Sequence, residues 1–232
     1  MCSLTTSASS DNPGLEKMPQ EKRHAALALL EFDSIASGVL ATDLMVKRAP
    51  IALLRCGTIH PGRFLILVGG SVASTEEAYE AGIEHGEGAG ALQDTILLSD
   101  IHPTLHDAVL GARQNLAHEA LAVVETSTSP ALLRAIDAAV KSTPVEIGEV
   151  RLADDLGGRA IALLSGDVAD VATALEICVE RAGNQLLGSS LLPRLDTDLR
   201  HLLEQGTEFR SCPPHEPDGA EHLEEVACSW DE

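Results

Sequence analysis

The chain contains one sequence pattern twice, and this internal repeat constrains its fold more than any other feature. An apolar segment at 27–31 that ends in Glu31 returns at 121–125, where it ends in Glu125. The copies are offset by 94 residues (121 − 27), and by 96 residues (158 − 62) beyond the proline that follows each predicted first helix. A repeat this long predicts two copies of a whole domain rather than a solenoid, so function should depend on how such domains are arranged.

Composition limits both the cores and the partners. Aromatic residues make up only 2% of the 232 residues, so the cores of two domains of roughly 90 residues each must be built from Ala, Val, Ile and Leu. The chain has 36 acidic and 16 basic residues, which gives a net charge of −20, and no stretch combines basic residues with aromatics. We therefore expect no nucleic-acid partner.

Cysteine usage and hydropathy indicate a reduced, cytoplasmic protein. The five cysteines are odd in number and form no CxxC pair, so neither a zinc cluster nor a disulfide framework is predicted. The N-terminal segment lacks a basic start followed by an apolar stretch, and no apolar run approaches the ~20 residues that span a bilayer. We expect no membrane partner and no export.

Periodicity predicts the same order of elements, βαββαβα, in each copy. The predicted fold class is α/β, more closely α+β and ferredoxin-like. Predicted strands lie at 26–32, 51–59, 63–68 and 95–98, and again at 120–126, 145–152, 159–164 and 189–192. Predicted helices lie at 34–49, 73–85 and 103–110, and again at 129–143, 169–182 and 197–204. The resulting units are a disordered leader at 1–24, a first domain at 25–112, a linker at 113–119, a second domain at 120–206 and an acidic disordered tail at 207–232.

Several separated segments resemble one known family. The segments at 30–38, 43–49 and 58–70 are similar, in order and spacing, to the bacterial microcompartment (BMC) shell domain, and the resemblance covers about 25–205. The stretch at 96–103 is especially similar to the flat T-type shell proteins of propanediol-utilisation compartments. The resemblance implies a homotrimer whose six domains form a pseudohexamer. It also implies tiling with other shell proteins (hexamers and pentamers) around encapsulated enzymes, in a shell within the bacterial cytoplasm.

Two loops are candidates for a central pore. On residues alone, His60-Pro61-Gly62 is a Pro-Gly turn between strands, and its counterpart is an acidic turn. The resemblance places both loops beside the trimer axis. The predicted pore-lining residues are His60, Pro61, Gly62, Asp154, Asp155, Leu156 and Gly157. The acidic groups would favour cations and neutral polar solutes over anions.

His60 is also a candidate metal ligand at that axis. Some relatives carry a cysteine at the matching position and hold an iron–sulfur cluster, but His60 replaces that cysteine and makes such a cluster unlikely. Three imidazoles could instead hold a divalent metal such as zinc, or remain free and set the width and charge of an open pore.

Four residues are predicted to lie at the edges where tiles meet. Lys47 and Lys141 end equivalent helices, where a lysine is ordinarily a solvated charge favoured by the helix dipole. The resemblance places these lysines at the tile edge, together with Arg194 of the second copy. The first copy has Asp100 in place of that arginine, so the two kinds of edge should differ chemically.

No enzyme signature is present, and we predict a structural protein. The alternative is a small-ligand-binding sensor or an enzyme built on a duplicated α/β domain, with its site in the cleft between the halves. His102 and His106 have the i, i+4 spacing of metal ligands, but they are expected to be exposed histidines on a short surface helix. The glycine-rich stretch at 86–90 is expected to be a flexible turn, since its position does not suit a dinucleotide.

Overall fold

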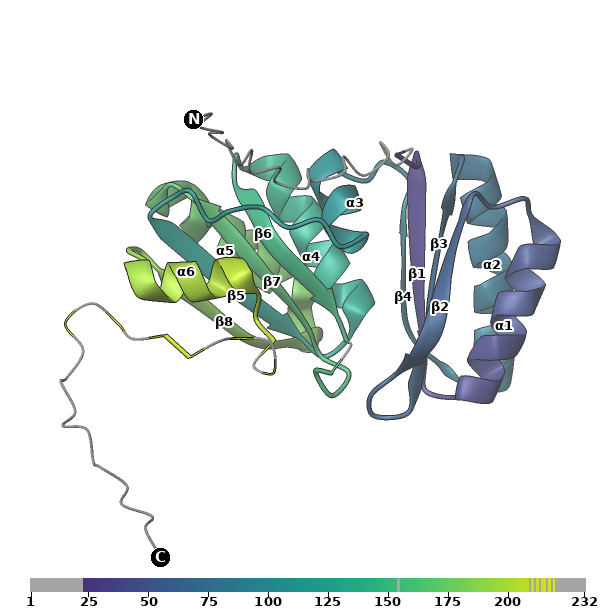
Figure 1. Cartoon of the computed structure of the whole chain (residues 1–232). Coiled ribbons are helices and arrows are strands. Elements are labelled where there is room, and N and C mark those ends of the chain that lie inside the picture. The colour runs from purple at the N-terminus through teal and green to yellow at the C-terminus, as the bar shows by residue number, and fades with distance from the viewer. Residues whose placement is uncertain are drawn as a thin grey trace, which may run out of the picture.

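The computed structural model describes residues 23–153 and 155–208, together with residues 210, 212, 214, 215, 217 and 219. In this part of the chain two α+β domains lie side by side, with the first domain at the right of Figure 1 and the second at the left. Each domain has a four-stranded sheet, in the order β2-β3-β1-β4 in the first and β6-β7-β5-β8 in the second. The predicted duplication and order of elements are confirmed.

The elements of the two domains correspond one to one. The first domain comprises β1 (Ala26–Phe32), α1 (Ile35–Arg48), β2 (Leu53–Ile59), β3 (Arg63–Gly70), α2 (Val72–Ala89), β4 (Leu92–Leu98) and α3 (Pro103–Val109). The second comprises β5 (Ala120–Thr126), α4 (Ser129–Ser142), β6 (Glu146–Leu152), β7 (Ala160–Gly166), α5 (Val168–Ala182), β8 (Leu186–Leu192) and α6 (Thr197–Gln205). A short 3-10 helix, Gly183–Gln185, precedes β8.

Strand registers define which residues of the two domains are equivalent. All strand pairs are antiparallel, with β1 and β5 at the centre of their sheets. Glu31 lies opposite Asp94 on β4, and Glu125 lies opposite Gly188 on β8. Helices α1 and α4 each have 14 residues and begin 94 positions apart (129 − 35). Contacts made by one domain can therefore be compared with those of the other residue by residue.

Strand β1 is buried on both faces. Leu30 and Phe32 pack into the core beneath α1 and α2, whereas Leu27 and Leu29 face a second core on the other side of the sheet. That second core contains apolar side chains of both domains, including Leu132 and Ile136 of α4 and Leu105 of α3. The two domains thus share a continuous apolar core.

Helix α4 is buried where its counterpart α1 is exposed. Helix α4 packs against β1 and β4 of the first domain as well as against α5 of its own. Leu133 is 1% exposed, while the equivalent Val39 on α1 is 54% exposed. Four further large apolar side chains of α1 are exposed, namely Ile35, Leu40, Leu44 and Val46. The same helix therefore has a covered outer face in one domain and an open one in the other.

Two local predictions are wrong. Residues 86–89 continue α2, and only Gly90, at φ +62°, turns out of the helix. Gly86 permits close packing, because a Cβ there would lie 2.9 Å from Phe32 Cε1. His106 is buried at 1% exposure rather than exposed, since its Nε2 accepts a hydrogen bond from the backbone N–H of His24 at 3.1 Å.

The buried thiol of Cys178 should be chemically inert in the folded protein. It lies in the core of the second domain, where its Sγ donates to the carbonyl oxygen of Ala135 at 3.7 Å. Burial raises the pKa of Cys178 to about 12. Because the thiolate is the reactive form, iodoacetamide at neutral pH should alkylate Cys178 only after unfolding. Peptide mass spectrometry of native and denatured samples checks this. Native alkylation of Cys178 as fast as that of the exposed Cys56 would contradict it.

Candidate functional site

The two predicted pore loops lie together at one end of the molecule, as the adjoining hairpin ends at the bottom of Figure 1 show. One loop joins β2 to β3 through His60, Pro61 and Gly62, and the other joins β6 to β7. They are in direct contact, because a Cβ at Gly158 would lie 2.9 Å from the carbonyl oxygen of His60 and 3.1 Å from Pro61 Cδ. One chain thus brings together two hairpins that are 96 residues apart (158 − 62).

The first loop presents His60 to solvent. The His60-Pro61 peptide bond is cis, and Gly62 has φ +92°, a left-handed conformation that glycine adopts without strain. The His60 side chain is exposed at the tip of the hairpin. Within the described part of a single chain, no three His, Cys, Asp or Glu side chains are grouped to hold a metal.

The second loop contributes an acidic tip. Asp155 is exposed at φ +58°, and its carboxylate accepts a hydrogen bond from Arg210 Nη2 at 2.9 Å. Leu156 is half-buried, and Gly157 is exposed with φ +64°. Asp154, the remaining predicted pore residue, lies outside the described residues.

The predicted edge residues fall into different environments. Lys47 is exposed, and its Nζ pairs with the carboxylate of Asp43, four residues earlier on α1, at 2.6 Å. Lys141 pairs in the same way with Asp137 at 2.7 Å, but it also donates to the carbonyl oxygen of Asp100 in the first domain. Two of the predicted edge residues, Lys141 and Asp100, are thus in contact across the domain interface. Arg194 is exposed just after β8.

A buried carboxylate, which sequence reasoning missed, joins the two domains. Glu31 on β1 is fully buried, and its Oε1 accepts a hydrogen bond from Arg63 Nη1 at 2.7 Å. Its Oε2 accepts from the backbone N–H of Ser129, the first residue of α4, at 3.0 Å. Arg63 also donates to the carbonyl oxygen of Ser127 at 3.2 Å. Burial raises the pKa of Glu31, while the hydrogen bonds from Ser129 and Arg63 partly oppose that shift.

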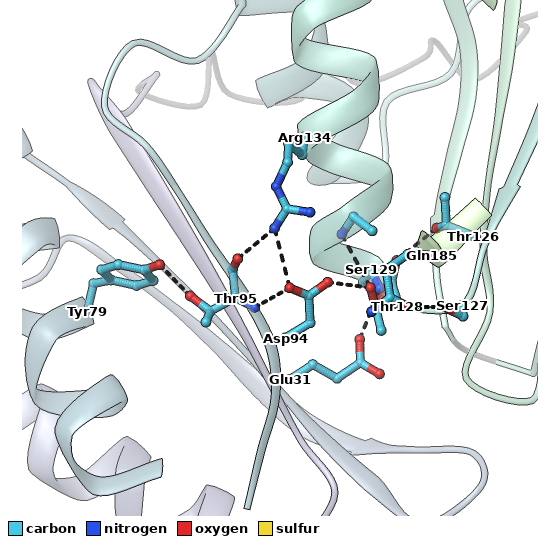
Figure 2. A network of polar contacts seen from close by, with 11 residues as sticks. Glu31, Tyr79, Asp94, Thr95, Thr126, Ser127, Thr128, Ser129, Arg134 and Gln185 are labelled. Atoms are coloured by element: carbon cyan, nitrogen blue, oxygen red, sulfur yellow. Dashed lines mark hydrogen bonds and ion pairs between the residues drawn. The ribbon is translucent and has the colours of Figure 1, made fainter. Parts of the chain in front are cut away.

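A second carboxylate of the first domain holds the same helix. Figure 2 shows Asp94 of β4 between Thr128, which caps α4, and Arg134 in the next turn. Arg134 Nη2 lies 3.3 Å from Asp94 Oδ1 and donates to the carbonyl oxygen of Thr95 at 3.0 Å. The start of α4 is therefore tied to the first domain by both Glu31 and Asp94. The signal in the sequence was an acidic residue recurring, as Glu31 and Glu125, within an otherwise apolar strand.

A cavity of about 530 Å³ lies between the halves, where the alternative prediction placed a ligand or catalytic site. It is lined by β2, α3, β6 and the first residues of the linker. Four of its charged side chains are engaged with each other, Arg113 with Glu149 and Arg151 with Glu208. None of the described residues that line it is a histidine, serine or lysine. Arg55, Cys56, Thr58 and Gln205 also line the cavity, but the described lining places no histidine beside Cys56 or Thr58 to act as a base.

Comparison with known families identifies the repeated unit. The profile of the BMC domain matches residues 26–100 and 120–195, which are the two domains of the structure. The chain belongs to the BMC domain family. It carries two BMC domains in tandem, so the resemblance seen in the sequence is confirmed.

Individual relatives agree with this assignment. The chain is 35% identical over 171 residues to the bacterial microcompartment shell protein PduT of Citrobacter freundii, which covers 73% of this chain and 92% of that protein. It is 28% identical over 215 residues to the carboxysome assembly protein CcmO of Synechocystis sp., covering 86% and 72%. A crystal structure of a microcompartment protein from Desulfitobacterium hafniense matches with a TM-score of 0.67 at 30% identity, over 76% of this chain and 98% of that one.

Membrane insertion through a helix finds no support in the described residues. None of the helices there is both long enough and apolar enough to cross a bilayer.

The buried carboxylate of Glu31 predicts that replacing Arg63 lowers the free energy of unfolding by an amount that depends on pH. Because the pKa of Glu31 is raised on folding, the folded state holds this proton to higher pH, and the contribution of Glu31 to stability falls as pH rises from its ordinary pKa through the raised one. Arg63→Met leaves the buried carboxylate without its cation and should lower the free energy of unfolding by about 3 kcal/mol at neutral pH. The loss should shrink at acidic pH, because protonation of Glu31 removes the buried charge that Arg63 offsets.

Urea denaturation at both pH values, at one protein concentration, measures the difference. The double variant Glu31→Gln/Arg63→Met has no carboxylate to titrate here, so its loss should not shrink on acidification; it should grow, because the unaltered protein gains stability as Glu31 is protonated. An Arg63→Met loss that is equally large at neutral and acidic pH would contradict the role assigned to Glu31.

Proposed function

We propose that this BMC protein is a structural shell protein of a bacterial microcompartment, in which three chains close into a flat ring of six domains. The observation that carries the proposal is the joint between its two domains. That joint covers the outer face of α4 and leaves the equivalent face of α1 open.

The interface that joins the two domains of a chain can also form between neighbouring chains. The first domain offers its sheet to α4. The equivalent sheet face of the second domain carries α6 through Leu203, but among the described residues no helix occupies the place that α4 takes on the first domain. The open face of α1 carries exposed apolar side chains, including Val39 and Leu40, which is typical of a protein contact surface. A head-to-tail contact repeated between copies closes into a ring when the rotation permits, and closed cyclic symmetry is common among soluble oligomers. Three two-domain chains would then imitate a hexamer.

Such a ring would have a central pore. The hairpin loops of both domains lie at one end of the molecule, so three copies would alternate His60 with the acidic loop around the axis. The negative charge of Asp155 and its neighbour Asp154 would favour cations and neutral polar solutes over anions. The pore would then admit small metabolites, or hold a divalent metal on three His60 imidazoles.

The outer edges of the ring would contact other tiles. Lys47, Asp100, Lys141 and Arg194 are all exposed in the single chain and remain candidates for these contacts. Partners of the proposed facet are other BMC shell proteins, both hexamers and pentamers, and encapsulated enzymes. The proposed location is the microcompartment shell in the bacterial cytoplasm. We propose no catalytic activity, because the relatives are shell and assembly proteins and the cavity between the domains lacks a catalytic set.

Reversing the charge at the edge should separate ring formation from tiling. Lys47→Asp should leave the trimer intact and abolish sheets, since it adds repulsion and removes lysine packing at a contact between tiles. Lys141→Asp should prevent sheets as well, but it should also lower stability, because Lys141 binds Asp137 and the Asp100 carbonyl across the domains. Negative-stain images show sheets, and light scattering shows the trimer. Normal sheets formed by Lys47→Asp would remove the edge assignment.

The metal hypothesis is tested by zinc content. After dialysis of tag-free protein in zinc and then in metal-free buffer, three neutral imidazoles should retain a single zinc ion per three chains. His60→Ala should retain none. Near-zero zinc in both proteins would leave His60 as a pore-lining residue only.

A further inference from the structure

We infer that Glu125 and Arg159 of one chain dock onto the start of helix α1 in the next copy of the chain. This contact would reproduce in trans what Glu31 and Arg63 do within a chain at the start of α4. The inference rests on the proposed trimer and assigns the polar atoms that would hold it together.

The docking pair is already formed on the second domain. Arg159 Nη1 donates to Glu125 Oε1 at 2.8 Å, as Arg63 Nη1 donates to Glu31 Oε1 at 2.7 Å. The side chains of Glu125 and Arg159 are 31% and 58% exposed, whereas those of Glu31 and Arg63 are 0% and 25% exposed. The second domain thus holds the same arrangement of a carboxylate and a guanidinium, with no helix above it.

The matching partner atoms lie at the start of α1. Within a chain, the partners of Glu31 and Arg63 are the N–H of Ser129 and the carbonyl oxygen of Ser127. The offset of 94 residues makes Ile35 and Asp33 their counterparts, and both are exposed. The N–H of Ile35 is a first-turn donor that the helix itself cannot satisfy, and the positive end of the dipole favours a carboxylate there. Glu125 would supply the missing acceptor.

A charged pair is present at the joint within a chain, and its two counterparts, which would meet at the proposed joint between chains, are both uncharged. Within a chain, Arg134 on α4 pairs with Asp94 on β4. The equivalent positions are Leu40 on α1 and Gly188 on β8, so both members of the charged pair are replaced together. Seating α1 on β4 would bury Asp94 without a cation, which is costly. Seating α4 on β8 would leave Arg134 without its acid. The pattern therefore favours α1 on the second domain of a neighbouring copy.

Two variants remove this bond from opposite sides. Glu125→Ala removes the acceptor. Ile35→Pro removes the donor while the helix is retained, because proline is favoured at the first helical position. Ser34, the residue before it, already has extended φ and ψ of −123° and 119°, as proline requires of its predecessor. Ile35→Ala is the matched control, since it shortens the side chain and retains the N–H.

Dissociation is measured by sedimentation velocity over a dilution series at one fixed urea concentration. That concentration is chosen so that half of the unaltered trimer is dissociated in the middle of the series. Glu125→Ala and Ile35→Pro should each move the dissociation midpoint to a higher concentration, by on the order of 30-fold. A hydrogen bond to a charged group contributes about tenfold to the dissociation constant, a closed trimer loses three of them, and the midpoint varies as the square root of that constant. Ile35→Ala, which loses apolar contact but keeps the N–H, should move it less than Ile35→Pro. The double variant should move it no further than Ile35→Pro alone, because both changes remove the same bond.

The outcomes separate this inference from the proposed trimer. A trimeric protein whose Ile35→Pro variant dissociates like Ile35→Ala, or whose double variant shows the product of the two single effects, would overturn the docking contact alone. A protein that is monomeric at every concentration, without urea, would overturn the proposed ring. Far-UV circular dichroism shows whether Ile35→Pro has kept its helices, and Glu125→Ala, at a partly exposed side chain, tests the contact independently.

Discussion

The arrangement of the two domains depends on one buried carboxylate, Glu31, which lies against the first N–H of helix α4. A carboxylate removed from water is costly unless its hydrogen-bond partners are in place. Here Arg63 and Ser129 supply them from the two domains, at 2.7 and 3.0 Å. Because the bonds are directional, only a narrow range of orientations between the domains satisfies them. The contact thus sets the angle at which one BMC domain meets the next.

Apolar burial supplies the energy of the joint, and the polar contacts supply its geometry. Leu132, Leu133 and Ile136 of α4 are almost fully buried against the shared core, and each such side chain contributes about 1.5–3 kcal/mol on transfer from water. Apolar packing alone would tolerate sliding of the helix over the sheet. The carboxylates prevent it, and the same orientation brings Gly158 against the His60 hairpin, so the pore loops meet as a consequence of how the domains join.

Sequence patterns predicted the duplication, the order of elements and the family. Strand alternation is a local pattern, and the repeat is found by comparing the sequence with itself, so neither requires knowledge of long-range contacts. Long-range contacts were beyond them. The glycines at 86–90 are typical of a turn, but Gly86 lies within α2, where the helix approaches Phe32 closely. His106 is buried, and its Nε2 accepts a hydrogen bond from the N–H of His24, 82 residues earlier in the chain. The role of Glu31 depends on Ser129, 98 residues away, which no local pattern reveals. The pore and edge residues remain predictions, since they concern contacts between chains.

The central claim is that the joint within a chain recurs between chains until the ring closes. Single-particle electron microscopy of the unaltered protein tests this most directly. The account predicts a disc of six similar lobes with threefold symmetry and a central depression, in which each lobe is one BMC domain. Particles with only two lobes, or open chains of lobes with no closed ring, would contradict it.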